Sequence, residues 1–146
     1  MTDLPTAPFR TTTRVRYGET DQMGIVYHAN YVSYFEIGRT ECMRRSGVTY
    51  ADMEKEGFRL AVVEISARYV RSARYDEVLT IETRLTDASA VRLRFDYRVL
   101  GPPPPDGGDG PLLCEGFTVL ACLNEAGRPT RIPSPWRERI EGLSAS

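Results

Sequence analysis

The chain has 146 residues, of which 41% are hydrophobic and 27% charged, a composition that fits one globular domain and excludes a chain that is disordered throughout. Its 19 basic and 20 acidic residues leave a formal net charge of -1, so no strong field favours nucleic acid or an anionic membrane. Three cysteines without a CxxC pair, no bilayer-length apolar run and no secretory leader predict reduced thiols in a cytoplasmic protein.

The first predicted elements are a tail and a strand. Residues 1–10 are expected to form a flexible N-terminal tail, and a single domain is expected over residues 11–140. Thr11 to Tyr17 is rich in threonine and predicts the first strand of that domain. A connection from Gly18 to Tyr27 then leads to a change of pattern.

A long helix is predicted from Asn30 to Gly47. We expect Asn30 to cap its start, because its side-chain oxygen can accept a free backbone N–H of the first turn. Gly47 suits the left-handed residue that ends a helix. Glu41 and Arg45 have the spacing of a favourable ion pair on the polar side. One helix face is formed by apolar or small residues at the spacing i, i+4, i+7 and i+11, namely Tyr31, Phe35, Gly38 and Cys42.

The remainder of the chain predicts a short helix and four strands. The short helix runs from Thr49 to Lys55. The strands are expected at Arg59 to Tyr69, Val78 to Leu85, Val91 to Val99 and Leu113 to Leu123. The third of these alternates strictly, with Val91, Leu93, Phe95, Tyr97 and Val99 on one face and charged residues on the other.

A segment rich in proline and glycine separates the last two strands. Gly101 to Pro111 reads GPPPPDGGDGP, and it predicts a flexible or polyproline-like surface hairpin loop. Strands that follow one another through short turns are most simply antiparallel. The sequence therefore predicts an α+β domain, with one sheet curled over one helix.

The connection before the long helix concentrates residues that can carry chemistry. Asp21 lies shortly before the helix, Gly24 follows it, and His28 is the single histidine of the chain. The first turn of a helix presents unpaired backbone N–H groups and a partial positive charge, which can hold a carbonyl oxygen as it becomes an oxyanion. Glycine allows a tight turn or close approach to a ligand. A carboxylate beside such donors is the minimum equipment for acyl transfer.

Other common sites lack their motifs. The chain contains no GxSxG, no GxxxxGK[ST] and no GxGxxG, and one histidine with three scattered cysteines gives no zinc set. We therefore expect neither a metal nor a cofactor. The candidate residues also have ordinary roles, since an aspartate before a helix is commonly a turn residue and a lone histidine commonly a packing residue.

The run YGETDQMGIVYHANYVSYFEIGRTECMRR, Tyr17 to Arg45, resembles the hotdog-fold thioesterases of the 4-hydroxybenzoyl-CoA thioesterase type, including their acyl-CoA thioesterase relatives of Tol-Pal operons. The likeness continues through ARYDEVLTIETRL, Ala73 to Leu85, and GRPTRIP, Gly127 to Pro133. The resemblance implies a hotdog fold, a five-stranded antiparallel sheet wrapped around one long central helix. It also implies hydrolysis of acyl-CoA thioesters without a metal or cofactor.

By this resemblance Asp21 and His28 are the catalytic residues. Asp21 is expected to attack the thioester carbonyl or to activate a water that does so, and the sequence leaves both roles open. The backbone N–H of His28 is expected to polarise the carbonyl oxygen, and its imidazole to orient Asp21 or the water. Substrate-binding residues are expected at Gly24, Val26, Tyr27, Asn30, Tyr31, Arg92 and Arg128, with Tyr34 also near the acyl pocket.

The resemblance further implies a homodimer or homotetramer with active sites at the dimer interface. Three alternatives stay open. In the first, the catalytic acid is Glu36 or Glu41 on the helix, as in some hotdog enzymes. In the second, the chain is a dehydratase-type hotdog. In the third, it is a non-catalytic module that binds acyl-CoA or acyl-carrier protein. The acyl group and the choice between a CoA and a carrier-protein thioester are also open.

Overall fold

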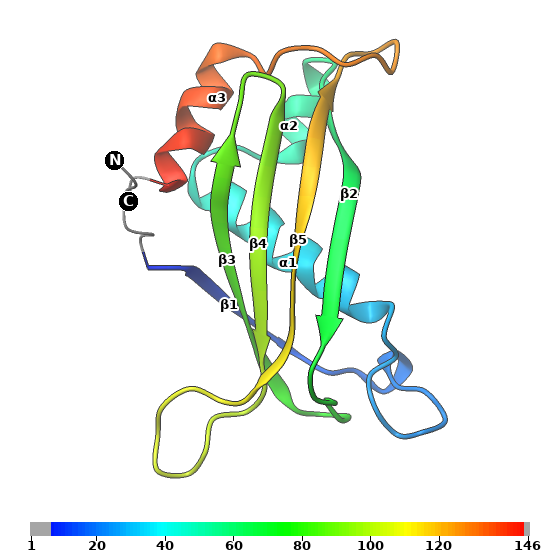
Figure 1. The fold of residues 1–146 in the computed structure, drawn as a ribbon. Coiled ribbons are helices and arrows are strands. Elements are labelled where there is room, and N and C mark those ends of the chain that lie inside the picture. Colours follow the sequence, from blue (N-terminus) through cyan, green and yellow to red (C-terminus); the bar gives the residue numbers. More distant parts are fainter. Residues whose placement is uncertain (1–6, 145–146) are drawn as a thin grey trace.

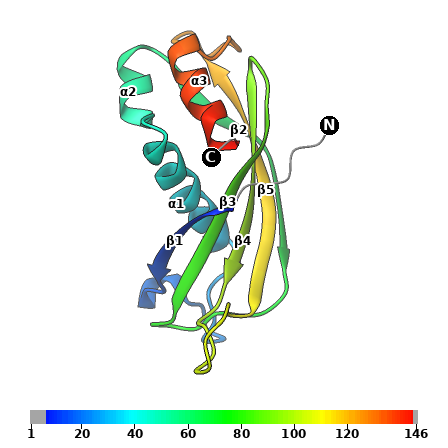
Figure 2. The ribbon, with the colours of Figure 1, turned by 90° about the vertical axis from the view of Figure 1, so that its left-hand side faces the viewer.

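The computed structural model describes residues 7–144, which form one antiparallel sheet with the helices on one of its faces (Figures 1 and 2). The strands are β1 (Phe9–Arg14), β2 (Arg59–Tyr69), β3 (Val78–Ala88), β4 (Arg92–Leu100) and β5 (Leu112–Leu123). They lie in the order β1-β3-β4-β5-β2, and each neighbouring pair is antiparallel. The predicted α+β architecture, a five-stranded sheet around one long helix, is confirmed.

The first strand lies earlier in the chain than the sequence predicted. β1 begins at Phe9, so Phe9 and Arg10 belong to the strand and not to the tail, and it ends before Val15. Residues 1–6 of the expected tail lie outside the described residues. The strand extends because Phe9 to Arg14 pair with the far edge of β3, a partner that the local pattern does not reveal.

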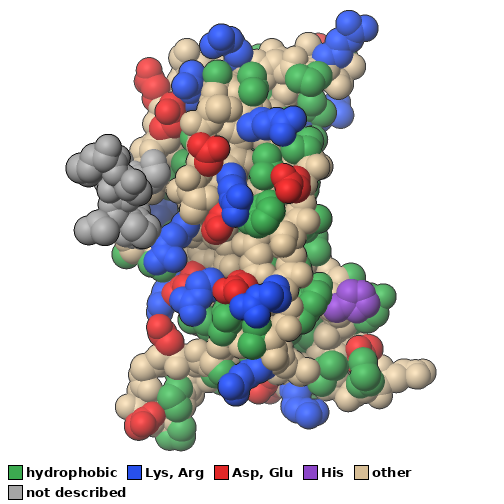
Figure 3. Space-filling view, in the orientation of Figure 1, with side chains coloured by type: hydrophobic (Ala, Val, Ile, Leu, Met, Phe, Trp, Pro, Cys, Tyr) green, Lys and Arg blue, Asp and Glu red, His purple; other side chains and the backbone are tan. Residues whose placement is uncertain are grey.

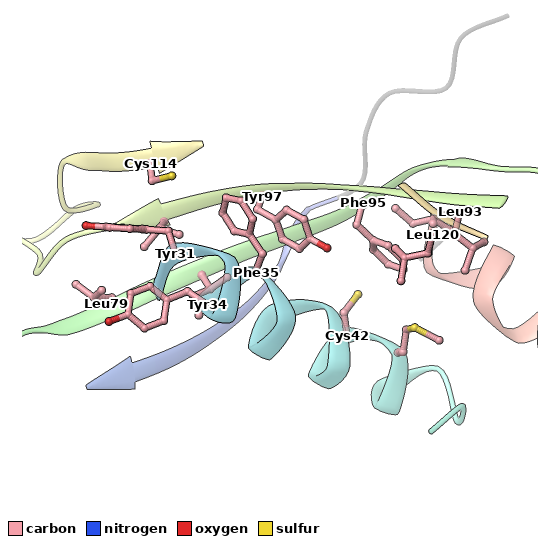
Figure 4. Close-up of a cluster of buried hydrophobic side chains, with 14 of the residues drawn as sticks. Tyr31, Tyr34, Phe35, Cys42, Leu79, Leu93, Phe95, Tyr97, Cys114 and Leu120 are labelled. Atoms are coloured by element: carbon pink, nitrogen blue, oxygen red, sulfur yellow. The ribbon is translucent and has the colours of Figure 1, made fainter. Parts of the chain in front are cut away.

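Helix α1 (Asn30–Arg45) fills the concave face of the sheet and forms the centre of the core (Figure 4). The Phe35 ring stacks on the Tyr97 ring of β4, with centroids 4.5 Å apart. Gly38 brings the helix backbone against β3, because a Cβ at this position would lie 2.7 Å from Ile81 Cγ2 and still closer to Thr83 Oγ1. The predicted helix face is confirmed, since Tyr31, Phe35, Gly38 and Cys42 are all buried.

Both predicted side-chain contacts at the ends of α1 are wrong. Ala29, not Asn30, is the capping residue; the Asn30 Nδ2 instead donates to the Glu19 carbonyl at 2.8 Å. Glu41 pairs with Arg44, one residue earlier than the predicted Arg45, at 3.4 Å. Arg45 turns away because its guanidinium lies over the Phe9 ring of β1, 5.5 Å from the centroid.

Two short helices cover the end of the core beyond α1. The predicted helix α2 (Tyr50–Lys55) is capped by Thr49, whose Oγ1 accepts from the Asp52 N–H at 3.2 Å. The sequence did not predict α3 (Ser134–Glu141), which buries Ile140 and places Trp136 edge-on to the Phe58 ring. None of the helices described in residues 7–144 is long and apolar enough to span a membrane.

The outer face of the sheet carries a row of alternating charges, and basic and acidic side chains interleave over it (Figure 3). Strand pairing aligns Arg10, Glu82, Arg98, Glu115 and Arg68 across all five strands. Ion pairs join Arg10 to Glu82, Arg98 to Glu82 and Arg68 to Glu115. This face is therefore polar, as the alternation in β4 predicted.

Two details at the ends of β4 differ from or add to the prediction. Val91, predicted as the first buried residue of the strand, precedes β4 and is exposed, because it lies in the turn after β3. The proline- and glycine-rich loop at 101–111 joins β4 to β5, and its ends are closed by a hydrogen bond from the Gly101 N–H to the Pro111 carbonyl. Asp109 of this loop forms an ion pair with Arg10 at 3.0 Å.

Candidate active site

A tight turn presents Asp21 between β1 and α1. After the short 3-10 helix η1 (Tyr17–Glu19), the Asp21 N–H donates to the Ile25 carbonyl and the Gly24 N–H donates to the Asp21 carbonyl, both at 2.9 Å. Gly24 has φ +79°, a left-handed conformation that favours glycine. The nearest atom to a Cβ built there is 3.9 Å away, so the backbone conformation and not crowding explains this glycine.

The Asp21 carboxylate is partly exposed and has one oxygen unused. Its Oδ1 accepts a hydrogen bond from the Met23 N–H at 2.8 Å, which holds the side chain across the turn. Among residues 7–144 no other hydrogen bond or ion pair engages this carboxylate. The remaining oxygen can therefore reach a water or an electrophile.

The turn is anchored to the segment before β3. Val26 is buried, and its N–H donates to the Ala73 carbonyl at 2.9 Å. Ile25 forms an isolated bridge with Arg74. The next residue, Tyr27, leaves the core with about half of its side chain exposed. Val26 thus fixes the turn, while Tyr27 remains open to a ligand.

Free backbone donors follow the turn at the start of α1. In the described part of the chain, the N–H groups of His28 and Ala29 donate no hydrogen bond. A helix of this length adds a partial positive charge of about half a unit at its N-terminus. The connection therefore places a carboxylate and unpaired donors within one short segment, as predicted.

The described neighbours of the His28 imidazole are aromatic rings. The described residues show no hydrogen bond or ion pair between the two side chains. His28 is exposed, and its ring lies 4.4 Å from the Tyr27 ring and edge-on to Tyr69 (purple in Figure 3). Within one chain, only the backbone of His28 takes part in the arrangement at the helix start.

Glu19 joins the turn to the helix. Its carboxylate accepts hydrogen bonds from the Arg16 N–H at 2.9 Å, the Arg16 Nε at 3.1 Å and the Tyr34 hydroxyl at 3.0 Å. Its carbonyl accepts from the Tyr27 N–H and the Asn30 Nδ2. Burial alone would raise the pKa of Glu19, but the hydrogen bonds outweigh it and lower the pKa. Glu19 is a site-supporting residue that the sequence analysis missed.

Tyr69 is a second supporting residue that was missed. It ends β2, and its hydroxyl donates to the His28 carbonyl at 2.9 Å. Its ring lies edge-on to Tyr31, which in turn lies edge-on to Tyr34. Tyr31 and Tyr34 are buried in the core, and burial raises the pKa of Tyr31 to about 12. The apolar spacing predicted their burial, but no local pattern links Tyr69 to the helix start.

Arg92 and Arg128 lie at the opposite end of the sheet from the turn (Figure 1). Arg92 begins β4 and pairs with Ala121, which pairs with Ala61 of β2. The eight residue-to-residue steps from Ala61 to Tyr69 span roughly 26 Å of strand. Arg128 lies in the turn after β5, at the same end as Arg92. One chain therefore does not bring these arginines to the turn.

The other nucleophiles and acids are less well placed. Cys42, Cys114 and Cys122 are free and buried, and burial raises the pKa of Cys42 and of Cys114 to about 11. Glu36 is exposed on α1, about 10 Å along the helix from Ala29. Glu41 is already paired with Arg44. In residues 7–144 no three His, Cys, Asp or Glu side chains gather as a metal site.

Comparison with known proteins identifies the family. A model described as the thioesterase-like superfamily matches residues 15–140. The chain belongs to this superfamily. The solved structure of a 4-hydroxybenzoyl-CoA thioesterase mutant complexed with 4-hydroxybenzoyl-CoA has a TM-score of 0.80, covering 92% of this chain and 99% of that one. At 21% identity this likeness shows the fold alone. The predicted hotdog fold and thioesterase family are confirmed.

Two curated bacterial relatives are similar in sequence. The acyl-CoA thioester hydrolase YbgC of Escherichia coli O6:H1 is 31% identical over 121 residues, which cover 83% of this chain and 86% of YbgC. The putative acyl-CoA thioesterase YneP of Bacillus subtilis is 42% identical over 88 residues. That match covers 60% of this chain and 64% of YneP, slightly less than two thirds of the relative.

Proposed function

We propose that the protein is a cytoplasmic acyl-CoA thioesterase that hydrolyses its substrate to a free acid and CoA, with Asp21 as the catalytic carboxylate. The observation that carries the proposal is the free oxygen of Asp21, a few residues from the unpaired His28 N–H at the start of α1. The activities named for YbgC and YneP, and the family of the chain, support this assignment.

In the proposed reaction the thioester carbonyl oxygen accepts a hydrogen bond from the His28 N–H. Asp21 either takes a proton from a water that attacks the carbonyl carbon, or attacks that carbon itself to form an anhydride that water then hydrolyses. Negative charge develops on the carbonyl oxygen in both routes. The C–S bond breaks as this charge returns to the carbonyl, which in the second route gives the anhydride that water cleaves to the free acid and Asp21. The leaving thiolate of CoA takes up a proton.

The residues around the turn have matching proposed roles. Gly24 lets the backbone approach the substrate, and the exposed Tyr27 flanks the thioester. Val26 and Asn30 hold the two ends of the connection in place through Ala73 and Glu19. Tyr31 is buried in the core of the single chain. We therefore propose that it contacts the end of the acyl group that is farthest from the thioester.

We propose that the active unit is a homodimer joined along β2, which can pair again into a tetramer. β2 is an edge strand, and unpaired strand edges favour association. It exposes a group of apolar side chains, Val62, Val63, Ile65 and Tyr69. Antiparallel pairing of two β2 strands about a two-fold axis would place the Arg59 end of one beside the Tyr69 end of the other.

This dimer would complete the substrate site. It places Arg92 and Arg128 of the partner subunit on the side of Asp21, whereas those of the same chain are roughly 26 Å away along the sheet. Arginine binds phosphate well, so these side chains are proposed to hold the nucleotide end of CoA. The two ends of one substrate would then lie on two subunits.

The proposal is tested with a panel of aromatic, short-chain and long-chain acyl-CoAs, following release of the free thiol. We expect turnover of one acyl class by the wild type. Asp21→Asn should fold normally and lower kcat by at least a hundredfold, because the carboxylate acts on the reacting atoms. Wild-type turnover by Asp21→Asn would refute the role of Asp21, and no turnover on any acyl-CoA would refute the substrate.

Glu36→Gln is the matched control for the rival helix carboxylate. It removes the same charge from an exposed position about 10 Å along α1 from Ala29. We expect its kcat to stay within about twofold of the wild type, the range of a surface charge change. The reverse pattern, with Glu36→Gln inactive and Asp21→Asn active, would assign the chemistry to the helix.

A further inference from the structure

Two consecutive peptide groups at the start of α1 share an unusual pattern of hydrogen bonds. The Tyr27 carbonyl accepts from the Asn30 N–H at 2.9 Å, and the His28 carbonyl accepts from the Tyr69 hydroxyl at 2.9 Å and the Tyr31 N–H at 3.3 Å. The N–H groups of the same two peptides belong to His28 and Ala29. In the described chain these N–H groups donate to nothing.

The Tyr69 hydroxyl is the one side-chain group among these partners, and it comes from a different element. Tyr69 pairs with Cys114 in the ladder between β2 and β5, which fixes its backbone. Its ring is held edge-on against His28, with centroids 6.1 Å apart, and against Tyr31 at 5.4 Å. Burial raises the pKa of Tyr69, so its hydroxyl remains a donor at neutral pH.

Hydrogen bonds polarise one another when they share a peptide group. A donor on a carbonyl draws electrons from the amide nitrogen and makes the N–H of that peptide a stronger donor. The His28 carbonyl and the Ala29 N–H belong to one peptide. The hydrogen bond from Tyr69 therefore makes the Ala29 N–H a stronger donor through the peptide group that they share. It also limits rotation of that peptide about the chain.

We propose that Tyr69 is a positioning residue that holds the Ala29 N–H beside the His28 N–H as a second donor to the oxyanion. This inference rests on the proposed thioesterase function. It deepens that function by adding a second donor and by making the geometry of the helix start depend on β2. Because Tyr69 lies on the strand edge of the proposed dimer, the oxyanion donors are also connected to that interface.

Tyr69→Phe tests the hydroxyl alone, because the ring and its contacts remain. We expect kcat to fall about tenfold, less than the hundredfold or more for outright loss of an oxyanion donor. KM should change by less than about twofold, because the ground-state carbonyl carries little of the charge that the donors stabilise. Tyr75→Phe is the matched control, since Tyr75 is also exposed, its ring lies edge-on to Tyr17 of η1 and its hydroxyl donates to no described residue.

A spectroscopic measurement separates positioning from a general loss of structure. In the Asp21→Asn background, the infrared carbonyl stretch of a bound acyl-CoA reports its polarisation by the backbone donors. We expect a shift to lower frequency on binding, and a smaller shift when Tyr69→Phe is added. Tyr69→Leu, which keeps an apolar side chain without a hydrogen-bond donor, should give the same loss and serves if the phenylalanine variant is unstable.

The outcomes distinguish this inference from the proposed function. If the wild type hydrolyses acyl-CoA and Tyr69→Phe changes neither kcat nor the carbonyl shift, the proposed role of Tyr69 is overturned. The proposed thioesterase function then still stands. Equal losses in Tyr69→Phe and Tyr75→Phe would also overturn the role of Tyr69. Absence of wild-type turnover on every acyl-CoA would instead overturn the function on which the inference rests.

Discussion

The carboxylate of Glu19 shows how a residue outside the chemistry can define the geometry of the site. It accepts hydrogen bonds from the Arg16 N–H and the Tyr34 hydroxyl, and the backbone carbonyl of Glu19 accepts one from the Tyr27 N–H. These bonds join η1, the residue before His28 and the buried face of α1. The position of Asp21 relative to the helix donors therefore depends on Glu19.

Glu19→Gln should destabilise the protein by about 1–2 kcal/mol at pH 7, because hydrogen bonds to a charged group become bonds to a neutral one. The pKa of Glu19 is lowered by folding, so its contribution is fully present above its unfolded pKa of about 4.3 and is lost as the pH falls through the folded value. The free-energy gap between wild type and variant should therefore narrow at acid pH.

Urea unfolding at pH 7 and pH 3 measures this gap. Glu56→Gln, at an exposed position whose carboxylate makes no described hydrogen bond, controls for the loss of a surface charge. A gap that is as wide at pH 3 as at pH 7 would contradict the assignment of the stabilisation to the ionised carboxylate.

The sequence was sufficient for some of these residues and insufficient for others. Asp21, Gly24 and the His28 backbone lie in one continuous segment, so their proximity follows from local chain geometry. Tyr69 is separated from His28 by 41 residues, and its hydrogen bond depends on how β2 meets α1. The Asn30 side chain was predicted as a cap but bonds to Glu19, because η1 supplies an acceptor that local rules do not anticipate.

At the scale of the elements, the backbone of α1 approaches β3 closely at one glycine. Gly38 faces β3 without a side chain, next to Thr83 and Ile81. The Thr83 hydroxyl is buried and has no hydrogen-bond partner in the described structure. A buried hydroxyl without a hydrogen-bond partner normally costs about 1–3 kcal/mol. The close packing of α1 on β3 at Gly38 is therefore retained although it leaves the Thr83 hydroxyl unpaired.

Gly38→Ala should therefore destabilise the protein, although alanine is the better helix former by about 1 kcal/mol. Its Cβ would lie 2.7 Å from Ile81 Cγ2 and still closer to Thr83 Oγ1, so two neighbours must move, and the upper part of the usual overpacking cost of about 1–3 kcal/mol exceeds the gain in helix propensity. Ser33→Ala, on the exposed face of the same helix, should leave the midpoint nearly unchanged. Thermal unfolding compares the two, and a stabilised Gly38→Ala would show that the close contact is relaxed in solution.

Elements with a clear period could be predicted and those without one could not. β4 alternates residue by residue, and the fold confirms its buried face of Leu93, Phe95, Tyr97 and Val99. α3 has only eight residues, and Trp136 and Ile140 are its single apolar pair at the i, i+4 spacing, which is too few to establish a helical period from the sequence. It is helical because Trp136 has the Phe58 ring to pack on, which is a tertiary contact.

At the scale of the whole molecule, the sheet separates two groups of residues that we propose to act on the substrate. The turn with Asp21 lies at one end, and Arg92 and Arg128 lie at the other. The exposed apolar edge of β2 runs between the two ends. A two-fold axis across that edge would join opposite ends of two chains, which gives a physical reason for an enzyme of this shape to require a dimer.

Ile65→Lys tests this arrangement, because Ile65 lies near the middle of the exposed edge strand. The side chain is 43% exposed in the single chain, so lysine should be tolerated in the folded monomer. Across a two-fold edge contact, however, the substitution brings two buried ammonium groups together, and an unpaired buried charge is strongly unfavourable.

We expect light scattering after size exclusion to give a dimer or larger oligomer for the wild type and a folded monomer for the variant. Thioesterase kcat/KM should fall at least tenfold, because Arg92 and Arg128 of the partner subunit are lost. Ile65→Val keeps the apolar edge and should retain both the oligomer and the activity. A fully active monomer would show that one chain holds the complete site.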